Sequence, residues 1–247
     1  MNNTSQTSQS GQLDGKTVLI FGGTSGIGLE AAIQAQQAGA NVIVVGRGSA
    51  SAEKVAKEHK FAGWRSTDVT DANAVEQAVK DIPTVDHPAL LAGTFVAGKV
   101  RDAEVGYLRR AFEEPIWAAV SVIRALGDRL SRDGSVTFIS GSLADRPNAY
   151  GTAVLAAASA AMEALARGLA LELAPTRFNT LSPGPIDTPL MHKAFGNARD
   201  GLVEGLKQLP LHRLGTAAEA GASVVFLMIN CFMNGVTLNL DGGARLV

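Results

Sequence analysis

Three of the four glycines in residues 22–28, namely Gly22, Gly26 and Gly28, have the spacing of a phosphate-binding loop and stand between an apolar run and a segment of helix-forming residues. At this spacing the first glycine allows a tight turn, the second lets the backbone approach a pyrophosphate, and the third lets a helix pack closely on a strand. The N-terminus of that helix would then face the anion with free N–H groups. A glycine turn without a ligand has the same composition, but the place between strand and helix favours a dinucleotide site. The other loop residues predicted to contact the dinucleotide are Thr24, Ser25 and Ile27.

The residues after the next two apolar runs indicate which dinucleotide is bound. Gly46 and Arg47 stand where an NAD site would carry an Asp or Glu for the ribose 2′-hydroxyl. A guanidinium suits a 2′-phosphate, because its planar fork donates two hydrogen bonds. The alternative is a solvated surface arginine, and the pattern predicts NADP(H) in preference to NAD(H). Asp68 and Val69 follow the third run, where a carboxylate could meet the adenine amino group, although Asp68 could also cap the next helix.

Short apolar runs and helix-forming segments alternate along the rest of the chain. The expected strands are 17–21, 41–45, 64–69, 88–91, 135–140, 177–181 and 236–240. The expected helices are 28–38, 51–59 (with Ser49 or Ser51 as cap), 71–81, 101–130 with a break near Pro115, 153–173 and 216–228, with 183–210 irregular apart from one or two short helices. This alternation predicts one Rossmann-like, doubly wound α/β domain over residues 13–247, with a parallel seven-stranded sheet flanked by helices. Residues 1–12 are expected to form a disordered polar tail.

Composition excludes several classes of protein. The chain has 247 residues, 46% hydrophobic and 18% charged, which is enough apolar material for a sizeable core. The net charge of -1 argues against a nucleic-acid partner. One cysteine, Cys231, allows no internal disulfide, and the four histidines lack the spacing of a metal site, so no metal is expected. The longest apolar segment, 153–174, is interrupted by charges and the N-terminus has no signal peptide pattern, so we expect no membrane partner and a cytoplasmic protein.

Two later segments complete a resemblance to the short-chain dehydrogenase/reductase family, which covers essentially the whole chain from Leu13. Residues 179–189, Asn-Thr-Leu-Ser-Pro-Gly-Pro-Ile-Asp-Thr-Pro, resemble the family's late signature, and 241–243 resemble its C-terminal Asp-Gly-Gly. The resemblance implies that the backbone near Ile186 and the hydroxyl of Thr188 hold the nicotinamide carboxamide. Pro183 and Gly184 belong to the same predicted cofactor segment.

The residues that catalyse the reaction in this family are not kept. The family uses Ser, Tyr and Lys, the last two spaced Tyr-x-x-x-Lys, usually with an Asn. Counting back from 163–165 places the Tyr position at Leu155 and the Lys position at Ser159. Leucine cannot donate a proton, and serine is a far weaker acid than a phenol, whose pKa is about 10. Losing a positioned acid costs roughly a hundred- to ten-thousandfold in rate.

Other residues are left as candidates for the missing groups. Ser142 precedes Leu155 by the spacing of the family's Ser and Tyr, and Ser140 competes for the same role. Tyr150 either swings into the site from its loop or is a surface tyrosine at a helix entry. Further possible proton donors are Asp145, Arg146, His192 and a water.

Two cofactor-facing positions also depart from the family. Its catalytic Asn falls at Glu114. Its Asn-Asn-Ala-Gly motif is reduced to Ala92 and Gly93, which still leaves room for the cofactor.

Two functions follow from this pattern. The first is an NADP(H)-dependent oxidoreductase that moves a hydride to or from a small-molecule carbonyl or alcohol, with a non-standard proton donor. The alternative is an NADP(H)-binding pseudoenzyme, a sensor or structural subunit. The resemblance also implies a homo-tetramer or homo-dimer. Residues 191–211 contain Phe195, Leu202, Leu206 and Leu209, which either line a pocket for an apolar substrate or pack within a lid.

Overall fold

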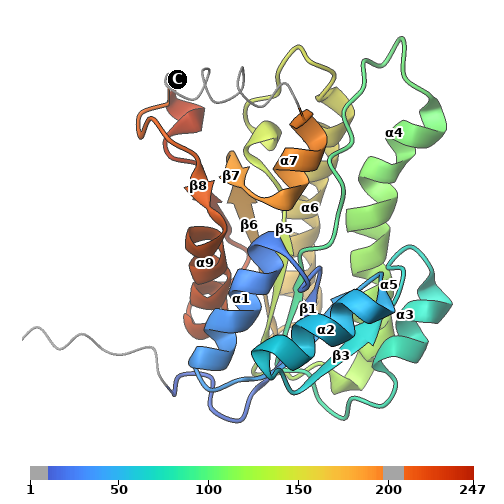
Figure 1. Ribbon diagram of the computed structural model, residues 1–247, viewed down its shortest axis with the longest axis vertical. Coiled ribbons are helices and arrows are strands. Elements are labelled where there is room, and N and C mark those ends of the chain that lie inside the picture. Colours follow the sequence, from blue (N-terminus) through green and yellow to red (C-terminus); the bar gives the residue numbers. More distant parts are fainter. Residues whose placement is uncertain (1–10, 197–208) are drawn as a thin grey trace, which may run out of the picture.

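The computed structural model describes residues 11–196 and 209–247 (Figure 1). Its main sheet has seven parallel strands in the order β3-β2-β1-β4-β5-β6-β9, which confirms the predicted sheet. These strands are β1 Thr17–Phe21, β2 Asn41–Gly46, β3 Gly63–Ser66, β4 His87–Leu90, β5 Ser135–Ile139, β6 Arg177–Pro183 and β9 Thr237–Leu240. Two short strands, β7 Ile186–Asp187 and β8 Gly215–Thr216, form a separate parallel pair.

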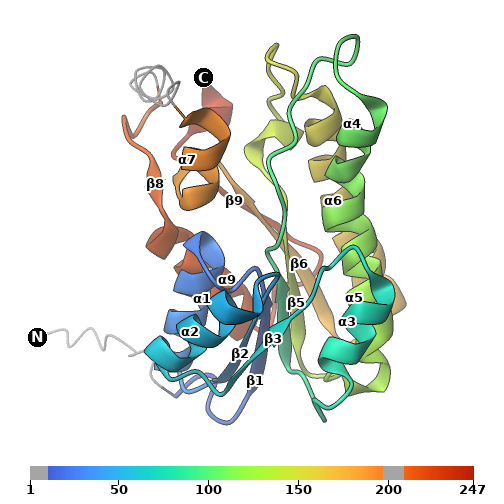
Figure 2. The same ribbon diagram turned by 45° about the vertical axis from the view of Figure 1, so that its right-hand side comes forward.

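Helices cover both faces of the sheet. They are α1 Gly26–Gln37, α2 Ser49–His59, α3 Ala72–Val79, α4 Val105–Phe112, α5 Ala118–Leu126, α6 Ala153–Glu172, α7 Pro189–Phe195 and α9 Ala217–Ile229. Figure 2 shows α1, α2 and α9 on one side of the sheet and α3, α5 and α6 on the other, and each layer encloses its own apolar core. The strand order reverses between β1 and β4, and ligands of doubly wound sheets bind at the carboxyl ends of strands at such a reversal.

Three local expectations are corrected. Gly48, and neither Ser49 nor Ser51, is the N-cap of α2. Strand β3 ends at Ser66, so Asp68 lies in a loop. The break expected near Pro115 is a π-helical turn, η1 (Glu113–Trp117), between α4 and α5. Proline has no N–H to donate, and a π-turn absorbs the resulting change in hydrogen-bond register without ending the helix.

Helix α6, which lies within the longest apolar segment of the sequence, is long and apolar enough to cross a membrane by length and composition alone. In the structure it packs against β5 and β6. Its inner side contributes Met162, Ala166 and Ala170 to the core. Packing on the sheet therefore accounts for the apolar residues on the inner side of α6, while the alanines on its outer side are exposed.

Buried His87 is expected to make the protein less stable in acid. Its Nδ1 lies 2.9 Å from Oγ of Ser135, and burial lowers the pKa of His87 to about 4. The unfolded chain, with a histidine pKa near 6.5, therefore binds more protons than the native one between about pH 4 and 6.5. His87 contributes its full stability above this range and loses roughly 3 kcal/mol of it as the pH falls through the range.

Denaturant unfolding across that pH range measures the effect. His87→Gln should flatten the acid side of the stability profile, whereas His59→Gln, at a half-exposed histidine stacked on Phe61, should keep the wild-type slope. An unchanged slope in His87→Gln would contradict the assignment.

Candidate functional site

The glycine loop between β1 and α1 has a geometry that only glycine allows. Gly22 has φ +81°, and a Cβ there would lie 2.9 Å from the backbone N of Ala92. A Cβ on Gly28 would lie 2.2 Å from the carbonyl oxygen of Gly22. The loop therefore curls tightly on the first turn of α1 and against the segment that follows β4, as the sequence predicts.

The same loop faces the segment predicted to hold the nicotinamide. A Cβ on Gly26 would lie 3.5 Å from Cβ of Thr188, although the two residues are far apart in the sequence. Ser25 is the N-cap residue of α1, but its side chain makes no capping hydrogen bond. The first N–H groups of α1 therefore have no side-chain cap, and a helix end of this kind binds a phosphate. The loop fits the pyrophosphate of a dinucleotide.

The carboxyl end of β2 brings together the residues predicted for the adenosine end. A Cβ on Gly46 would lie 2.7 Å from Cγ2 of Thr24, so the glycine loop rests on the end of β2. Arg47 follows with an exposed side chain, and its carbonyl accepts a 2.9 Å hydrogen bond from Oγ of Ser66. Thr24 and Arg47 thus lie at one end of the loop, where a cationic group suits a 2′-phosphate.

Asp68 lies near Arg47 and is kept ionised. Its Oδ1 accepts hydrogen bonds from N and Oγ1 of Thr70, at 3.0 and 2.7 Å. These bonds lower the pKa of Asp68, and the charge of Arg47 lowers it further. The cap of α3 is Asp71, which accepts from N of Asn73 and Ala74, so Asp68 does not have the capping role considered as its alternative.

The nicotinamide segment is held in place by the C-terminal Asp-Gly-Gly motif. A Cβ on Gly184 would lie 2.8 Å from Cα of Asp241, and N of Gly184 donates to the carbonyl of Leu240 at 2.9 Å. Thr188 is the N-cap of α7 and accepts from N of Met191. Two motifs that the sequence separates by more than fifty residues therefore form one wall of the site.

The residues that the sequence predicts at the family's catalytic positions also meet at the carboxyl end of β5. Ser142 is half-buried and begins the short 3₁₀ helix η3 (Ser142–Ala144). Leu155 and Ser159 lie one turn apart on α6, and Ser159 is only 9% exposed. A Cβ on Gly141 would lie 3.9 Å from Oγ of Ser159, so this hydroxyl points to the segment that joins β5 to η3.

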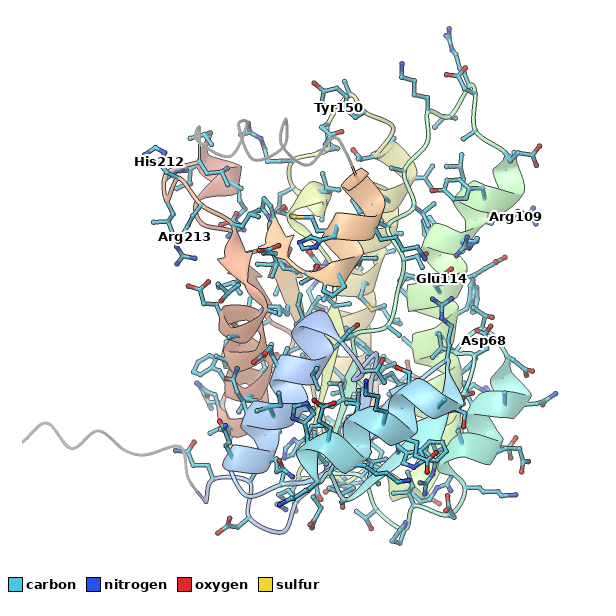
Figure 3. All side chains as sticks on the ribbon, in the orientation of Figure 1. Asp68, Arg109, Glu114, Tyr150, His212 and Arg213 are labelled. Carbon is cyan, nitrogen blue, oxygen red and sulfur yellow. The ribbon has the colours of Figure 1, made fainter. Side chains whose placement is uncertain are left out.

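Tyr150 lies at the outer end of the loop that precedes α6, and its side chain is 84% exposed. Figure 3 shows it at the top of the molecule, far from Asp68. Its backbone N donates to Oδ1 of Asn148 at 2.9 Å. A catalytic Tyr150 would require this loop to move inward, and its role stays a prediction.

Two acidic side chains near the site had no predicted catalytic role. Glu114 accepts hydrogen bonds from Oγ1 of Thr94 at 2.6 Å and from Nε of Arg110 at 2.9 Å, which ties the π-turn to the segment after β4. Glu163 accepts a 2.9 Å hydrogen bond from Oγ of Ser140. The sequence signal that places Glu163 near the predicted catalytic positions is its spacing of four residues from Ser159, because residues four apart share a helix face.

The remaining predicted residues lie farther along the chain. Nε2 of His192 lies 2.6 Å from Oδ1 of Asp187. Of the predicted apolar pocket, Leu209 is half-buried, whereas Leu202, Leu206 and the side chain of Phe195 lie outside the described residues. Within residues 11–196 and 209–247, no group of three or more His, Cys, Asp or Glu side chains could hold a metal ion.

The doubly wound sheet and the glycine loop at its switch point define a dinucleotide-binding domain. Residues 22–245 match the profile of the family described as enoyl-(acyl carrier protein) reductase. With its curated and structural relatives, this match shows that the chain belongs to the short-chain dehydrogenase/reductase family, and the site fits a nicotinamide cofactor.

Three relatives illustrate the range of the family. Trans-4-hydroxycyclohexanecarboxylate dehydrogenase of Sinomonas cyclohexanicum is 32% identical, covering 92% of this chain and 92% of its own. The cyclic-di-GMP-binding biofilm dispersal mediator protein of Escherichia coli K12 is 30% identical, covering 94% of this chain and 98% of its own. A solved small-chain dehydrogenase in complex with NADPH is 32% identical with a TM-score of 0.82, over 95% of this chain and all of the other.

Proposed function

We propose that this protein is an NADP(H)-dependent oxidoreductase that moves a hydride to or from a small-molecule carbonyl or alcohol, with a non-standard proton donor. The observation that carries the proposal is the contact between the glycine loop at Gly26 and the nicotinamide segment at Thr188. When bound, the cofactor supplies the hydride chemistry. The chain binds its pyrophosphate at residues 22–28 and orients its nicotinamide between Ile186 and Thr188.

The test of this function is a titration of the purified protein with NADPH and with NADH, followed by carbonyl-dependent NADPH oxidation. Tight NADPH binding with turnover supports the proposal. Ser142 and Tyr150 are the catalytic residues carried over from the sequence, and Tyr150→Phe removes only the phenol hydroxyl. Failure to bind any nicotinamide nucleotide would overturn the proposal.

Arg47→Asp should reverse the cofactor preference. The guanidinium is placed to bind a 2′-phosphate, and hydrogen bonds to charged groups contribute roughly 1.5–3 kcal/mol, or about ten- to a hundredfold in affinity. NADPH binding should weaken by that factor, while NADH, whose 2′-hydroxyl can donate to the new carboxylate, should bind as well or better.

Fluorescence titration with both nucleotides measures this change. Lys54→Asp, a charge reversal at an exposed position of the neighbouring helix α2, is the matched control and should leave the preference unchanged. Equal losses of NADPH binding in the two variants would show only the effect of net charge.

One observation favours a second function, a cofactor-binding protein without turnover. The family's proton donor and its lysine are replaced by Leu155 and Ser159, and the relative in Escherichia coli is named for binding a nucleotide and mediating biofilm dispersal. NADPH binding without oxidation across a broad panel of carbonyls and quinones would select this alternative.

We also propose a homo-dimer or homo-tetramer that pairs through α6. The outer side of this helix carries the exposed small residues Ala157, Ala160 and Ala164, which allow close helix packing. Light scattering on the purified protein tests the proposal, and a monomeric mass would contradict it.

A further inference from the structure

A row of polar side chains crosses three strands at their carboxyl ends. Ser140 follows β5, and its N donates to the carbonyl of Leu181 on β6 at 2.8 Å. Ser182 is the register partner of Asn239 on β9. Aligned residues of parallel strands point to the same face, because side chains alternate along each strand. Ser140, Ser182 and Asn239 therefore form one row on one face of the sheet, which we call the polar row.

Helix α6 covers the polar row. Phe138, two residues before Ser140 and thus on the same face, lies in one core cluster with Met162 of α6. From this helix, Glu163 accepts the hydrogen bond of Ser140. Ser159, one turn earlier, points its hydroxyl to Gly141. Ser159 and Glu163 of α6 thus converge on the segment 140–141, at the end of the strand where the predicted catalytic positions lie.

The polar row has unmet hydrogen-bonding capacity within the described part of the chain. Ser182 is 1% exposed, and its Oγ has no hydrogen-bond partner among the described residues. The buried Oδ1 of Asn239 also has no hydrogen-bond partner among them. Buried polar atoms are costly without partners, and ordered water is their usual partner in such places. The row therefore suits one or more buried waters beside Ser140 and Glu163.

Resting on the proposed function, we propose that Glu163 is the proton acceptor of alcohol oxidation, reached through Ser159 and the polar row. A serine hydroxyl both donates and accepts, so it can relay a proton, whereas an ionised carboxylate only accepts. A glutamate on a helix also leans toward the N-terminus of the helix, which here is the direction of Ser159. Glu163 therefore does not touch the substrate. It acts through Ser159, which relays the proton to its carboxylate.

The step balances as follows. The C–H bond of the alcohol breaks and its hydride, with both electrons, goes to NADP⁺. The O–H proton passes to the oxygen of Ser159, whose own proton moves through water in the row to the carboxylate of Glu163. The C=O bond forms, and Glu163 is left as a carboxylic acid that returns its proton to solvent.

Glu163 is the charged group that ends the polar row, and the other charged groups around α6 are not bonded to this row in the described part of the chain. Neither β5 nor η3 carries a charged side chain. In β6, Arg177 donates to carbonyls of α9 on the other face of the sheet. Arg110 of α4 pairs with Glu114. The other titratable side chains on the packed helices are Tyr107, Arg109 and Glu113. On α6 itself, Arg167, one turn after Glu163, and Glu172 are exposed. Among the described residues, Ser140 is the only hydrogen-bond partner of the Glu163 carboxylate.

The first test uses binding and needs no turnover. NADP⁺ is titrated calorimetrically into the full-length protein, in buffers of equal pH that differ in ionisation enthalpy, to count the protons released on binding. A relay that joins the nicotinamide site to Glu163 couples cofactor binding to proton transfer, so the wild type should release protons. Glu163→Gln, which can still accept from Ser140, should lose this release. Glu172→Gln, at an exposed glutamate on the same helix, should keep it.

The second test is the pH profile of alcohol oxidation. Glu163→Gln should lower the rate roughly a hundredfold or more and remove the acid limb of the profile, since it removes a positioned base. Glu163→Asp should restore part of both. Unchanged proton release in Glu163→Gln, or an unchanged acid limb, overturns the inference while leaving the proposed function intact. Failure of the wild type to bind NADP⁺ overturns both.

Discussion

Gly28→Ala should nearly abolish NADPH binding. The added Cβ would lie 2.2 Å from the carbonyl oxygen of Gly22 and 2.8 Å from its carbonyl carbon, and both are backbone atoms that cannot turn aside. The loop must therefore move away from α1 by about an ångström, and a displacement of that size costs roughly a hundredfold at a site of fixed geometry. Fluorescence titration with NADPH measures the loss.

Gly168→Ala is the matched control for this substitution. Gly168 lies inside α6, and a Cβ there would have no neighbour within 4 Å. Alanine at an open helical position should raise stability by roughly 0.5–1 kcal/mol and leave NADPH affinity unchanged. Wild-type affinity in Gly28→Ala would show that residues 22–28 do not bind the pyrophosphate.

Arg177→Met should cause the largest loss of stability. Arg177 is buried, and its guanidinium donates to the carbonyls of Leu227, Met228 and Met233 at 2.8–3.0 Å. Burial lowers the pKa of Arg177, but an arginine stays charged at neutral pH. The substitution leaves the carbonyls of Leu227 and Met228, in the last turn of α9, without this donor and removes one of the two donors to Met233, at a cost of roughly 3 kcal/mol or more.

Thermal unfolding should show this cost as a fall in Tm of about 6–12 °C for a chain of this size. Arg177→Lys should recover only part of it, because one ammonium cannot reach all three carbonyls. Arg124→Met, on the exposed side of α5, should stay within about 0.5 kcal/mol of the wild type. A Tm of Arg177→Met equal to that of Arg124→Met would contradict the assigned role.

The sheet could be predicted from the sequence because its inner strands are buried on both faces and therefore appear as continuous apolar runs, as in β1 and β2. The ends of the elements were less accurate. Gly48 caps α2 with its backbone, and no side-chain signal marks such a start. The π-turn at Pro115 depends on how α4 and α5 pack, which composition does not contain.

The glycine loop was predictable because its chemistry is local. The contacts of Glu163 with Ser140 and of Arg177 with α9 join residues 23 and about fifty positions apart, so they exist only after the sheet and helices have packed. The sequence alone predicts Arg177 only as the first residue of a strand, and it marks Glu163 only as part of the segment that aligns with the family.

The reversal of strand order between β1 and β4 divides the site between two halves of the chain. Thr24, Arg47 and Asp68 precede β4, whereas Ser142, Ser159 and Glu163 follow it. Mutations can therefore remove or replace the residues that transfer the proton without changing the residues that bind the adenosine end of the cofactor. Over evolutionary time, a lineage built this way can pass between enzyme and sensor while every ancestor still folds around the same nucleotide.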